Sequence, residues 1–304
     1  MKKSKILLPI MLIVSLAIVI SSVVVSLTAG INLGIDFVGG KQIEIQVPDG
    51  QNTESYAASV ADVLDDYGLS IDSSYDEDKF TSSYFVVKIN TQDLSAEKAS
   101  NIRSDIAEKL SLPLENVSEV LSISGSVTQK TVLTVGFSIL GILVAIFAIC
   151  WLRYGVMEAL AILFGSLHVM IISFAIILLT RVPLTVASCV SIFASSVAFA
   201  GLFALILEKA RETLRAKTNN QTPREVYADA FNGSLVMIVI VLAAMLLFGI
   251  ATLFVSANII KLFAVSVALS ALVAFYSLFV STTLCGYLAQ AKVARDKHKL
   301  SKNN

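Results

Sequence analysis

Charged and metal-binding side chains are scarce in this sequence of 304 residues. Only 15% of the residues are Asp, Glu, Lys or Arg, and there are two His and three Cys. Cys150, Cys189 and Cys285 all fall in apolar stretches, so neither a disulfide framework nor a CxxC metal site is available. The sequence shows no nucleophile–base pair, no phosphate loop and no basic patch with interleaved aromatics. We therefore expect neither an enzyme nor a nucleic-acid-binding protein, with no metal and no cofactor.

Long apolar stretches are abundant instead. The chain is 56% hydrophobic with a mean hydropathy of +0.78, and about 20 apolar residues suffice to cross a bilayer. The first stretch is long and lacks an A-x-A-like cleavage site, which favours a retained anchor over a signal peptide. The composition therefore predicts a polytopic α-helical membrane protein with six transmembrane helices. They are expected at about 6–28, 131–152, 156–180, 184–207, 234–256 and 259–288.

Basic residues near the ends of these stretches indicate the orientation. They gather before the first stretch, after the fourth and after the sixth, whereas the turns at the other end offer only Arg181 and Lys261. Because Lys and Arg stay on the cytoplasmic side, both termini are expected in the cytoplasm, in a plasma membrane. The expected parts are a cytoplasmic N-terminus with the first helix (1–30), an extracytoplasmic domain (31–129), helices two to six (130–290) with a cytoplasmic segment (208–232), and a basic cytoplasmic tail (291–304).

The extracytoplasmic part is acidic and mixes helical with strand patterns. Residues 29–130 hold 17 Asp or Glu against 7 Lys or Arg, which is typical of solubility beside an anionic membrane, while binding of a metal or of basic clients stays open. Alternation predicts strands at 41–47, 84–90 and 117–123, with a further short one at 69–74. Helical spacing at 53–68 and 95–110 completes a β-α-β-β-α-β order, which predicts a ferredoxin-like α+β domain.

A glycine-rich turn, GIDFVGG, joins the first apolar stretch to the first predicted strand. It contains Gly34, Asp36, Phe37, Gly39 and Gly40. Glycines permit backbone angles and close approaches that other side chains forbid, and an Asp can hydrogen-bond a nearby backbone turn. This stretch is either a simple tight turn or a shaped joint that couples the membrane helices to the external domain.

Polar residues inside the apolar stretches are few, and their roles stay open at this point. His168 is the only titratable side chain well inside a span, and it either relays protons or hydrogen-bonds a neighbouring helix. Ser188, Ser191 and Ser195 share one stripe of the fourth span with other small residues. That stripe favours close helix packing, with a polar lining for a transport path as the weaker alternative.

The segment after the fourth span is expected to continue that helix into the cytoplasm. Glu208, Lys209, Arg211 and Glu212 lie in it, and its basic residues either set the topology or contact a cytoplasmic partner. Thr222 and Glu225 flank Pro223 in the pattern of a capping box with proline at the first helical position. A second helix is therefore expected to lead into the fifth span.

Several stretches together resemble one family. GIDFVGG closely resembles the signature that follows the first span of SecF, the smaller half of the SecD–SecF protein-export complex, and Phe37 favours SecF over SecD-type chains. Looser likenesses occur in the same order along the chain. They are SGSVTQ (124–129, with Ser126 in place of a proline), LRYGVMEALAILFGSLHVMIIS (152–173), LEKARETLR (207–215) and LLFG (246–249).

This resemblance implies the RND-type, SecDF-like architecture and a role in protein export. It implies a SecD-like subunit and a SecYEG-type channel as partners, secreted polypeptides as clients, and contact with membrane lipid. The alternatives are a divergent RND-like transporter subunit for lipids or small molecules, and a non-transporting assembly protein.

The sequence departs from the family where its ionisable residues are expected. By the resemblance, an Asp should fall near Leu202, a second Asp at Val169 and an Arg near Ala230; all three positions are apolar or small. No Asp, Glu or Arg lies near enough in those spans to replace them. Either a SecD-like partner supplies the proton relay, or export proceeds without a proton gradient.

Overall fold

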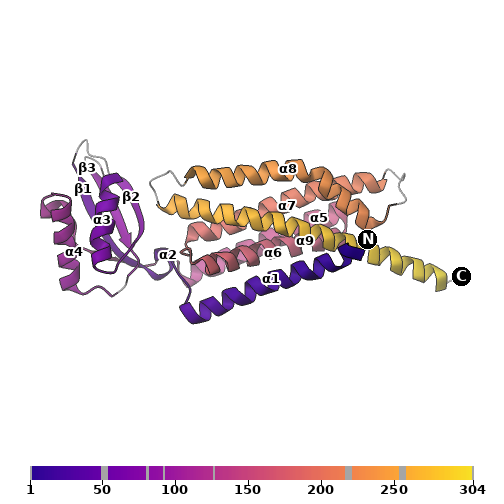
Figure 1. Cartoon of the computed structure of the whole chain (residues 1–304), viewed down its shortest axis with the longest axis horizontal. Helices are drawn as coiled ribbons and strands as arrows, with labels where there is room; N and C mark the ends of the chain where they lie inside the picture. The colour runs from indigo at the N-terminus through magenta and orange to yellow at the C-terminus, as the bar shows by residue number, and fades with distance from the viewer. Residues whose placement is uncertain are drawn as a thin grey trace.

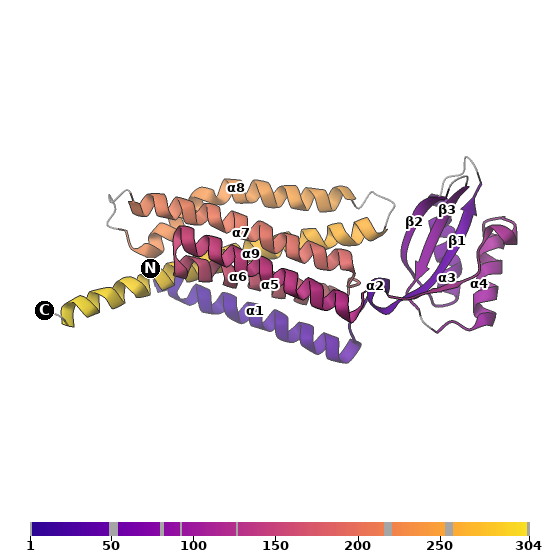
Figure 2. The same ribbon diagram turned by 180° about the vertical axis from the view of Figure 1, so that it is seen from behind.

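The computed structural model places a bundle of long helices beside a small α+β domain (Figure 1). It describes residues 2–48, 54–79, 82–91, 93–125, 127–215, 221–252 and 258–302. Both chain ends lie at the end of the bundle away from the α+β domain (Figures 1 and 2). Within these residues, six helices are long and apolar enough to cross a membrane, over Leu8–Ala29, Lys130–Tyr154, Val156–Thr180, Val186–Arg215, Pro223–Thr252 and Phe263–Arg295.

The bundle consists of three central helices with three others around them. α6 (Val156–Thr180), α7 (Val186–Arg215) and α9 (Asn258–Lys302) pack on one another, α8 (Pro223–Thr252) lies against α7 and α9, and α5 (Gln129–Tyr154) and α1 (Lys2–Ala29) lie against α6. Large apolar side chains fill the centre. Among the most deeply buried are Ile162, Phe199, Phe203, Ile206, Ile238 and Leu278.

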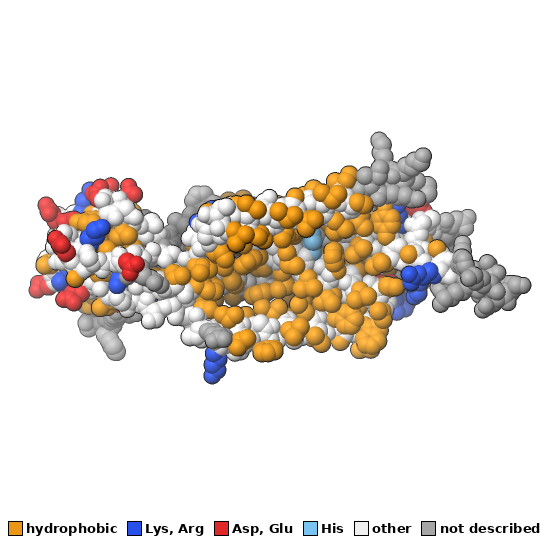
Figure 3. Space-filling model, turned by 90° about the horizontal axis from the view of Figure 1, so that it is seen from below, with side chains coloured by type: hydrophobic (Ala, Val, Ile, Leu, Met, Phe, Trp, Pro, Cys, Tyr) orange, Lys and Arg blue, Asp and Glu red, His pale blue; other side chains and the backbone are white. Residues whose placement is uncertain are grey.

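The outer surface of the bundle is also apolar. Leu27 is 82% exposed and Leu152 is 86% exposed, and hydrophobic side chains cover the bundle while charges gather at its end and on the α+β domain (Figure 3). In water such a surface would be costly, whereas lipid chains match it. The protein is therefore a multi-pass membrane protein.

The α+β domain has the expected order of elements. The sheet order is β2-β3-β1-β4 with every neighbouring pair antiparallel, and residues of helices α3 and α4 share its core. Ile45 faces Phe85 across β1 and β3. This is the arrangement of a ferredoxin-like domain. The elements are β1 (Gly40–Val47), α3 (Glu54–Asp66), β2 (Ile71–Lys79), β3 (Ser82–Ile89), α4 (Ala96–Lys109), η1 (Leu114–Asn116) and β4 (Leu121–Ile123).

Several boundaries differ from those that the sequence predicts. The strand expected at 117–123 is only Leu121–Ile123, because η1 ends just before Val117, which makes a single bridge to Ile45. β2 is longer than the expected 69–74 and includes the acidic run 72–78. No separate helix precedes the fifth span, since α8 continues from Pro223 to Thr252, and α9 extends through most of the tail. Ser126 lies outside the described residues.

Candidate functional site

The turn after α1 is bonded to the connection between α6 and α7. The Gly34 N–H donates to the Leu184 carbonyl at 2.9 Å, and the Leu184 N–H donates to the Asn32 carbonyl at 2.8 Å. A Cβ on Gly34 would lie 2.7 Å from Cγ2 of Thr185, a distance that real Cβ atoms do not adopt. Glycine is therefore required here because two backbone segments lie edge to edge.

Asp36 links the same turn to the start of α7. Its Oδ2 accepts a hydrogen bond from the Val186 N–H at 3.0 Å, so a carboxylate satisfies one of the free N–H groups at a helix N-terminus. The Asp36 carbonyl accepts from the Val127 N–H at 2.9 Å, in the connection from β4 to α5. The sequence suggested a hydrogen bond from the Asp36 side chain to a nearby backbone turn. The partner that the structure shows is 150 residues away in the chain.

Gly39 and Gly40 bring the turn into the sheet. α2 (Ile35–Val38) ends at Gly39, which has φ +75° and ψ −171°, a region that only glycine adopts readily. A Cβ on Gly39 would lie 2.6 Å from the Ile123 carbonyl oxygen, and one on Gly40 would lie 2.4 Å from that of Ile89. Gly125, on the outgoing strand connection, approaches the Phe37 carbonyl just as closely.

Phe37 points into the bundle side of this turn. It packs against a small apolar cluster formed by Ile177, Leu184 and Ile192. Two polar side chains reinforce the contact, because Asn32 Nδ2 donates to the Arg181 carbonyl at 2.7 Å and Asn90 Nδ2 donates to the Leu33 carbonyl at 2.8 Å. We call the residues 30–40, 123–125, 127 and 181–186 the motif joint.

The motif joint brings together five residues that the sequence singles out with several that it does not. Leu184, Thr185, Val186 and Gly125 complete it. The only local signal for Leu184, Thr185 and Val186 is the proline-containing connection RVPLTV (181–186). Gly125 is one of many glycines in the sequence. Neither pattern indicates its partner.

His168 lies in a polar network between three helices. Its Nε2 lies 2.8 Å from Ser15 Oγ on α1, and its Nδ1 lies 2.7 Å from Ser277 Oγ on α9. The Tyr276 hydroxyl lies 2.9 Å from Ser15 Oγ and donates to the Met11 carbonyl at 2.5 Å. His168 is only 8% exposed and stacks against Phe164. Both ring nitrogens therefore have hydroxyl partners, and no carboxylate accompanies them among the described residues.

The predicted serine stripe of α7 faces the centre of the bundle. Ser188 Oγ accepts from Ser266 Oγ of α9 at 3.1 Å, and Ser191 Oγ donates to the Ser188 carbonyl at 2.7 Å. Ser195 is fully buried, and its hydroxyl has no hydrogen-bond partner among the described residues. The same holds for further buried serine hydroxyls on the facing helices. They are Ser166, Ser173, Ser270 and Ser281.

The three positions where the family resemblance implies ionisable groups lie together in the apolar core. Val169, Leu202 and Ala230 are at most 5% exposed and belong to the same cluster of buried side chains. Phe199 and Phe203 stack within it with ring centroids 5.8 Å apart. A charge placed there would lack water and a counter-ion.

The charged residues at the C-terminal end of α7 mainly contact their own chain. Glu208 forms an ion pair with Arg153 at 3.2 Å, Lys209 Nζ donates to the Gly233 carbonyl at 2.6 Å, and Arg211 donates to the Arg153 carbonyl at 2.8 Å. Glu212 is exposed. These contacts join the α5–α6 turn and α8 to the end of α7, so their structural role is internal bracing.

Two apolar cavities lie beside the N-terminal part of α7 and share Cys189 and Phe193. One, of about 400 Å³, lies among α1, α6 and α7. The other, of about 330 Å³, lies between α5 and α7 and has Phe37 in its wall. Among the described residues, no three His, Cys, Asp or Glu gather in a way that could hold a metal ion. The chemistry of these regions is therefore packing and hydrogen bonding.

Comparisons with known proteins agree with this geometry. Residues 24–47 match the model of the SecD/SecF GG motif, and this stretch ends in β1 and includes the first segment of the motif joint, 30–40. No curated protein sequence matches the chain.

Two solved structures share the fold. One is a crystal structure of SecDF in a super-membrane-facing form, at 17% identity and a TM-score of 0.74 over 98% of this chain and 40% of that chain. The other is SecDF from Thermus thermophilus, described as a translocon-associated membrane protein, at 17% identity and a TM-score of 0.60 over 89% of this chain and 36% of that chain. This chain spans about 40% of the length of the SecDF chain that it covers best. The chain thus carries the SecD/SecF GG motif and shares the fold of these SecDF chains.

Proposed function

We propose that this chain is a SecF-type auxiliary subunit of a protein-export complex in the plasma membrane. It acts with a SecD-like partner and a SecYEG-type channel, and it promotes the passage of secreted polypeptides. The observation that carries the proposal is the motif joint, in which a GG motif matched to SecD/SecF occupies the connection between membrane helices and a ferredoxin-like domain. We also propose that both termini face the cytoplasm, which the basic residues at that end of the bundle support.

The decisive experiment is a pull-down of the tagged full chain in mild detergent, with mass spectrometry of the retained proteins. Recovery of a SecD-like protein, with or without the translocation channel, is the expected result. Recovery of the chain only with itself, or with an unrelated membrane protein, would remove the export assignment. Depletion of the chain should also cause the precursor of a secreted reporter to accumulate.

We further propose that this subunit promotes export without a proton relay of its own. Val169, Leu202 and Ala230 are buried among apolar side chains, and His168 has only hydroxyl partners at hydrogen-bond distance. His168→Gln, which keeps a hydrogen-bonding side chain, should therefore leave secretion per molecule unchanged. A marked secretion defect at normal abundance of the protein would show that His168 carries protons.

A second function, a divergent RND-like transporter for lipids or small molecules, is favoured by one observation. The two cavities beside α7 are lined almost entirely by apolar side chains, as a path for an acyl chain requires. Phe193→Ala and Cys189→Ala affect both cavities at once. Loss of lipid movement in vesicles that hold the purified chain alone would support this function, whereas an unchanged rate would leave the export role.

A further inference from the structure

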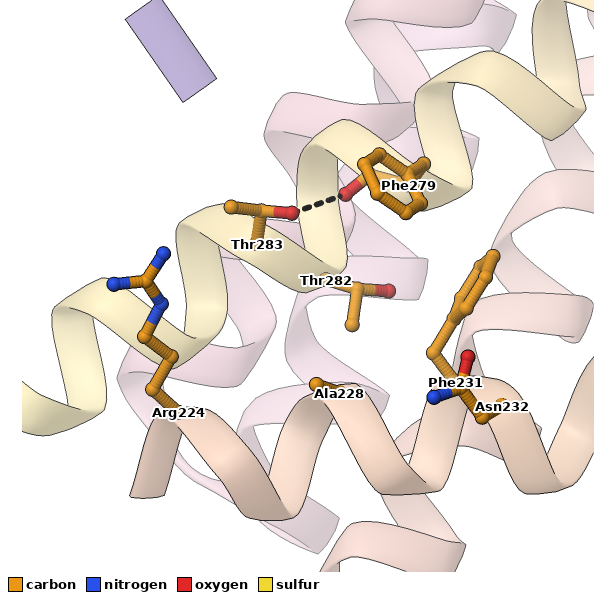
Figure 4. A pocket seen from close by; sticks show the side chains of 7 residues that line it. All are labelled: Arg224, Ala228, Phe231, Asn232, Phe279, Thr282 and Thr283. Atoms are coloured by element: carbon orange, nitrogen blue, oxygen red, sulfur yellow. Dashed lines mark hydrogen bonds between the residues drawn. The ribbon is translucent and has the colours of Figure 1, made fainter. Parts of the chain in front are cut away.

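A pocket between α8 and α9 lies at the end of the bundle that carries both termini. It has a volume of about 210 Å³, and its walls come from the first three turns of α8 and from the second half of α9 (Figure 4). Seven side chains line it. They are Arg224, Ala228, Phe231, Asn232, Phe279, Thr282 and Thr283.

The pocket is polar at its mouth and apolar at its inner end. Arg224 lies over the ring of Tyr287, with its guanidinium carbon 4.3 Å from the ring centroid. Phe231 and Phe279 meet edge to face at 5.5 Å and close the inner end. Since Tyr287 and Phe279 are eight residues apart on α9, mouth and inner end are separated by about 12 Å at the helical rise.

Within the described parts of the chain, no ion pair joins the Arg224 guanidinium to a carboxylate. Among the described residues its only recorded side-chain interaction is with Tyr287. The nearest acidic residues on its own helix are engaged elsewhere, because Glu225 accepts from the Thr222 N–H at 2.9 Å and Asp229 accepts from Gln221 at 2.9 Å. The guanidinium is partly buried beside an N-terminal helix end, where anions are favoured.

Asn232 is a second polar group without a protein partner. It is exposed on the outer face of α8, within a segment long and apolar enough to span a membrane, and no hydrogen bond to another described residue is recorded for it. The threonine hydroxyls beside it already donate to the Leu278 and Phe279 carbonyls.

We propose that this pocket binds an anionic phospholipid of the leaflet at this end of the bundle. The lipid phosphate pairs with Arg224, an ester carbonyl accepts from the Asn232 amide, and an acyl chain lies against Phe231 and Phe279. Arg224 and the two phenylalanines lie at opposite ends of the pocket, as the phosphate and the acyl chains do in a phospholipid. Exposed Lys292 and Arg295, on the next turns of α9, add positive charge on the same side and favour a headgroup with net negative charge. This inference does not depend on a role in export.

The test is a titration of the purified full chain with dioctanoyl-phosphatidylglycerol, followed by native mass spectrometry. Arg224→Ala should weaken binding about tenfold, as expected for the loss of one charge-assisted contact. Arg215→Ala removes the same charge from an exposed site at the end of α7 and should change the affinity less than about twofold. Asn232→Leu, an exposed position where folding is not at risk, should also weaken binding measurably.

Three outcomes would overturn the proposal. Equal weakening by Arg224→Ala and Arg215→Ala would reduce the interaction to general surface charge. Inorganic phosphate that displaces the lipid at equal concentration would show a free-phosphate site in place of a lipid site. Equal affinities for dioctanoyl-phosphatidylcholine and dioctanoyl-phosphatidylglycerol would show that the pocket does not select a headgroup with net negative charge.

Discussion

The Asp36 carboxylate lies 3.0 Å from the backbone nitrogen of Val186 and caps α7, although the two residues are 150 positions apart in the chain. Through this bond the segment that enters the external domain is fixed to the start of a central membrane helix. Asp and Asn are both good N-cap residues, whereas Ala is not.

Asp36→Ala should therefore destabilise the protein by about 0.5–2 kcal/mol, the usual cost of losing an N-cap side chain. Asp36→Asn keeps an acceptor oxygen and should lose much less. Thermal unfolding of both variants in the same detergent measures the difference. Equal losses for Ala and Asn would mean that the negative charge, and not the hydrogen bond, matters at this position.

Gly39→Ala should be more damaging than Gly68→Ala. Both glycines have positive φ, +75° and +70°, but a Cβ on Gly39 would lie 2.6 Å from the Ile123 carbonyl oxygen whereas one on Gly68 meets nothing within 4 Å. Gly68→Ala carries only backbone strain, of about 1–2 kcal/mol. Gly39→Ala adds a clash with backbone and should lower the amount of folded protein. Similar melting temperatures for the two variants would contradict the close approach.

Ser277→Ala and Ser270→Ala should have different effects, although both serines are fully buried on α9. The Ser277 hydroxyl bonds His168 Nδ1 at 2.7 Å, whereas the Ser270 hydroxyl has no partner among the described residues. Ser277→Ala should cost about 0.6–2 kcal/mol, the range for hydrogen bonds between membrane helices. Ser270→Ala should be neutral or stabilising because it removes an unpaired hydroxyl. Equilibrium unfolding in detergent compares them, and a larger loss for Ser270→Ala would reveal a partner there.

Stability of the α+β domain should fall as the pH rises above about 10. The hydrogen bond and charge of Asp62 raise the pKa of Lys109, and the hydrogen bond with Asp105 raises the pKa of Tyr67. Lys109 on α4 pairs with Asp62 on α3, and Asp105 on α4 pairs with Tyr67, which directly follows α3. A raised pKa in the folded state gives stability that is complete below the unfolded pKa, about 10 for Tyr and 10.4 for Lys, and that is lost as the pH passes the folded value.

Two measurements across pH 9–11.5 test this loss. One is the melting temperature of the full chain, and the other is the rate at which a protease cleaves the α+β domain. Asp62→Asn with Asp105→Asn serves as the control and should flatten the pH dependence in that range. An unchanged slope in the double variant would place the alkaline sensitivity elsewhere. The expected effect is small because the Lys109–Asp62 pair is exposed and the Tyr67–Asp105 pair is only partly buried.

The elements whose formation depends on local pattern could be predicted from the sequence. Apolar length predicted the spans, and the alternation of β1 and β3 predicted the ferredoxin-like order, because period and length act within a segment. The capping box at Thr222 and Glu225 is present with both reciprocal bonds. The strand expected at 117–123 forms only over Leu121–Ile123, because η1 turns the chain just before residue 117.

The contacts of the site could not be predicted, because they join residues far apart in the sequence. The partners of Asp36, His168 and Gly39 come from other helices or strands, and only the tertiary packing brings them within bonding distance. Glycine spacing indicated a constrained turn, but it did not identify Thr185 and Ile123 as the residues that approach Gly34 and Gly39. A single His likewise indicated a polar contact without identifying Ser15 or Ser277.

The motif joint also determines how force passes through the molecule. The chain enters the α+β domain beside Gly39 and leaves it beside Gly125, and these two connecting segments touch each other and the start of α7. A pull on the domain therefore reaches α7 directly through these contacts, in addition to the covalent connections to α1 and α5. Because β2 also contacts α9, the load is shared between the start of α7 and a second central helix.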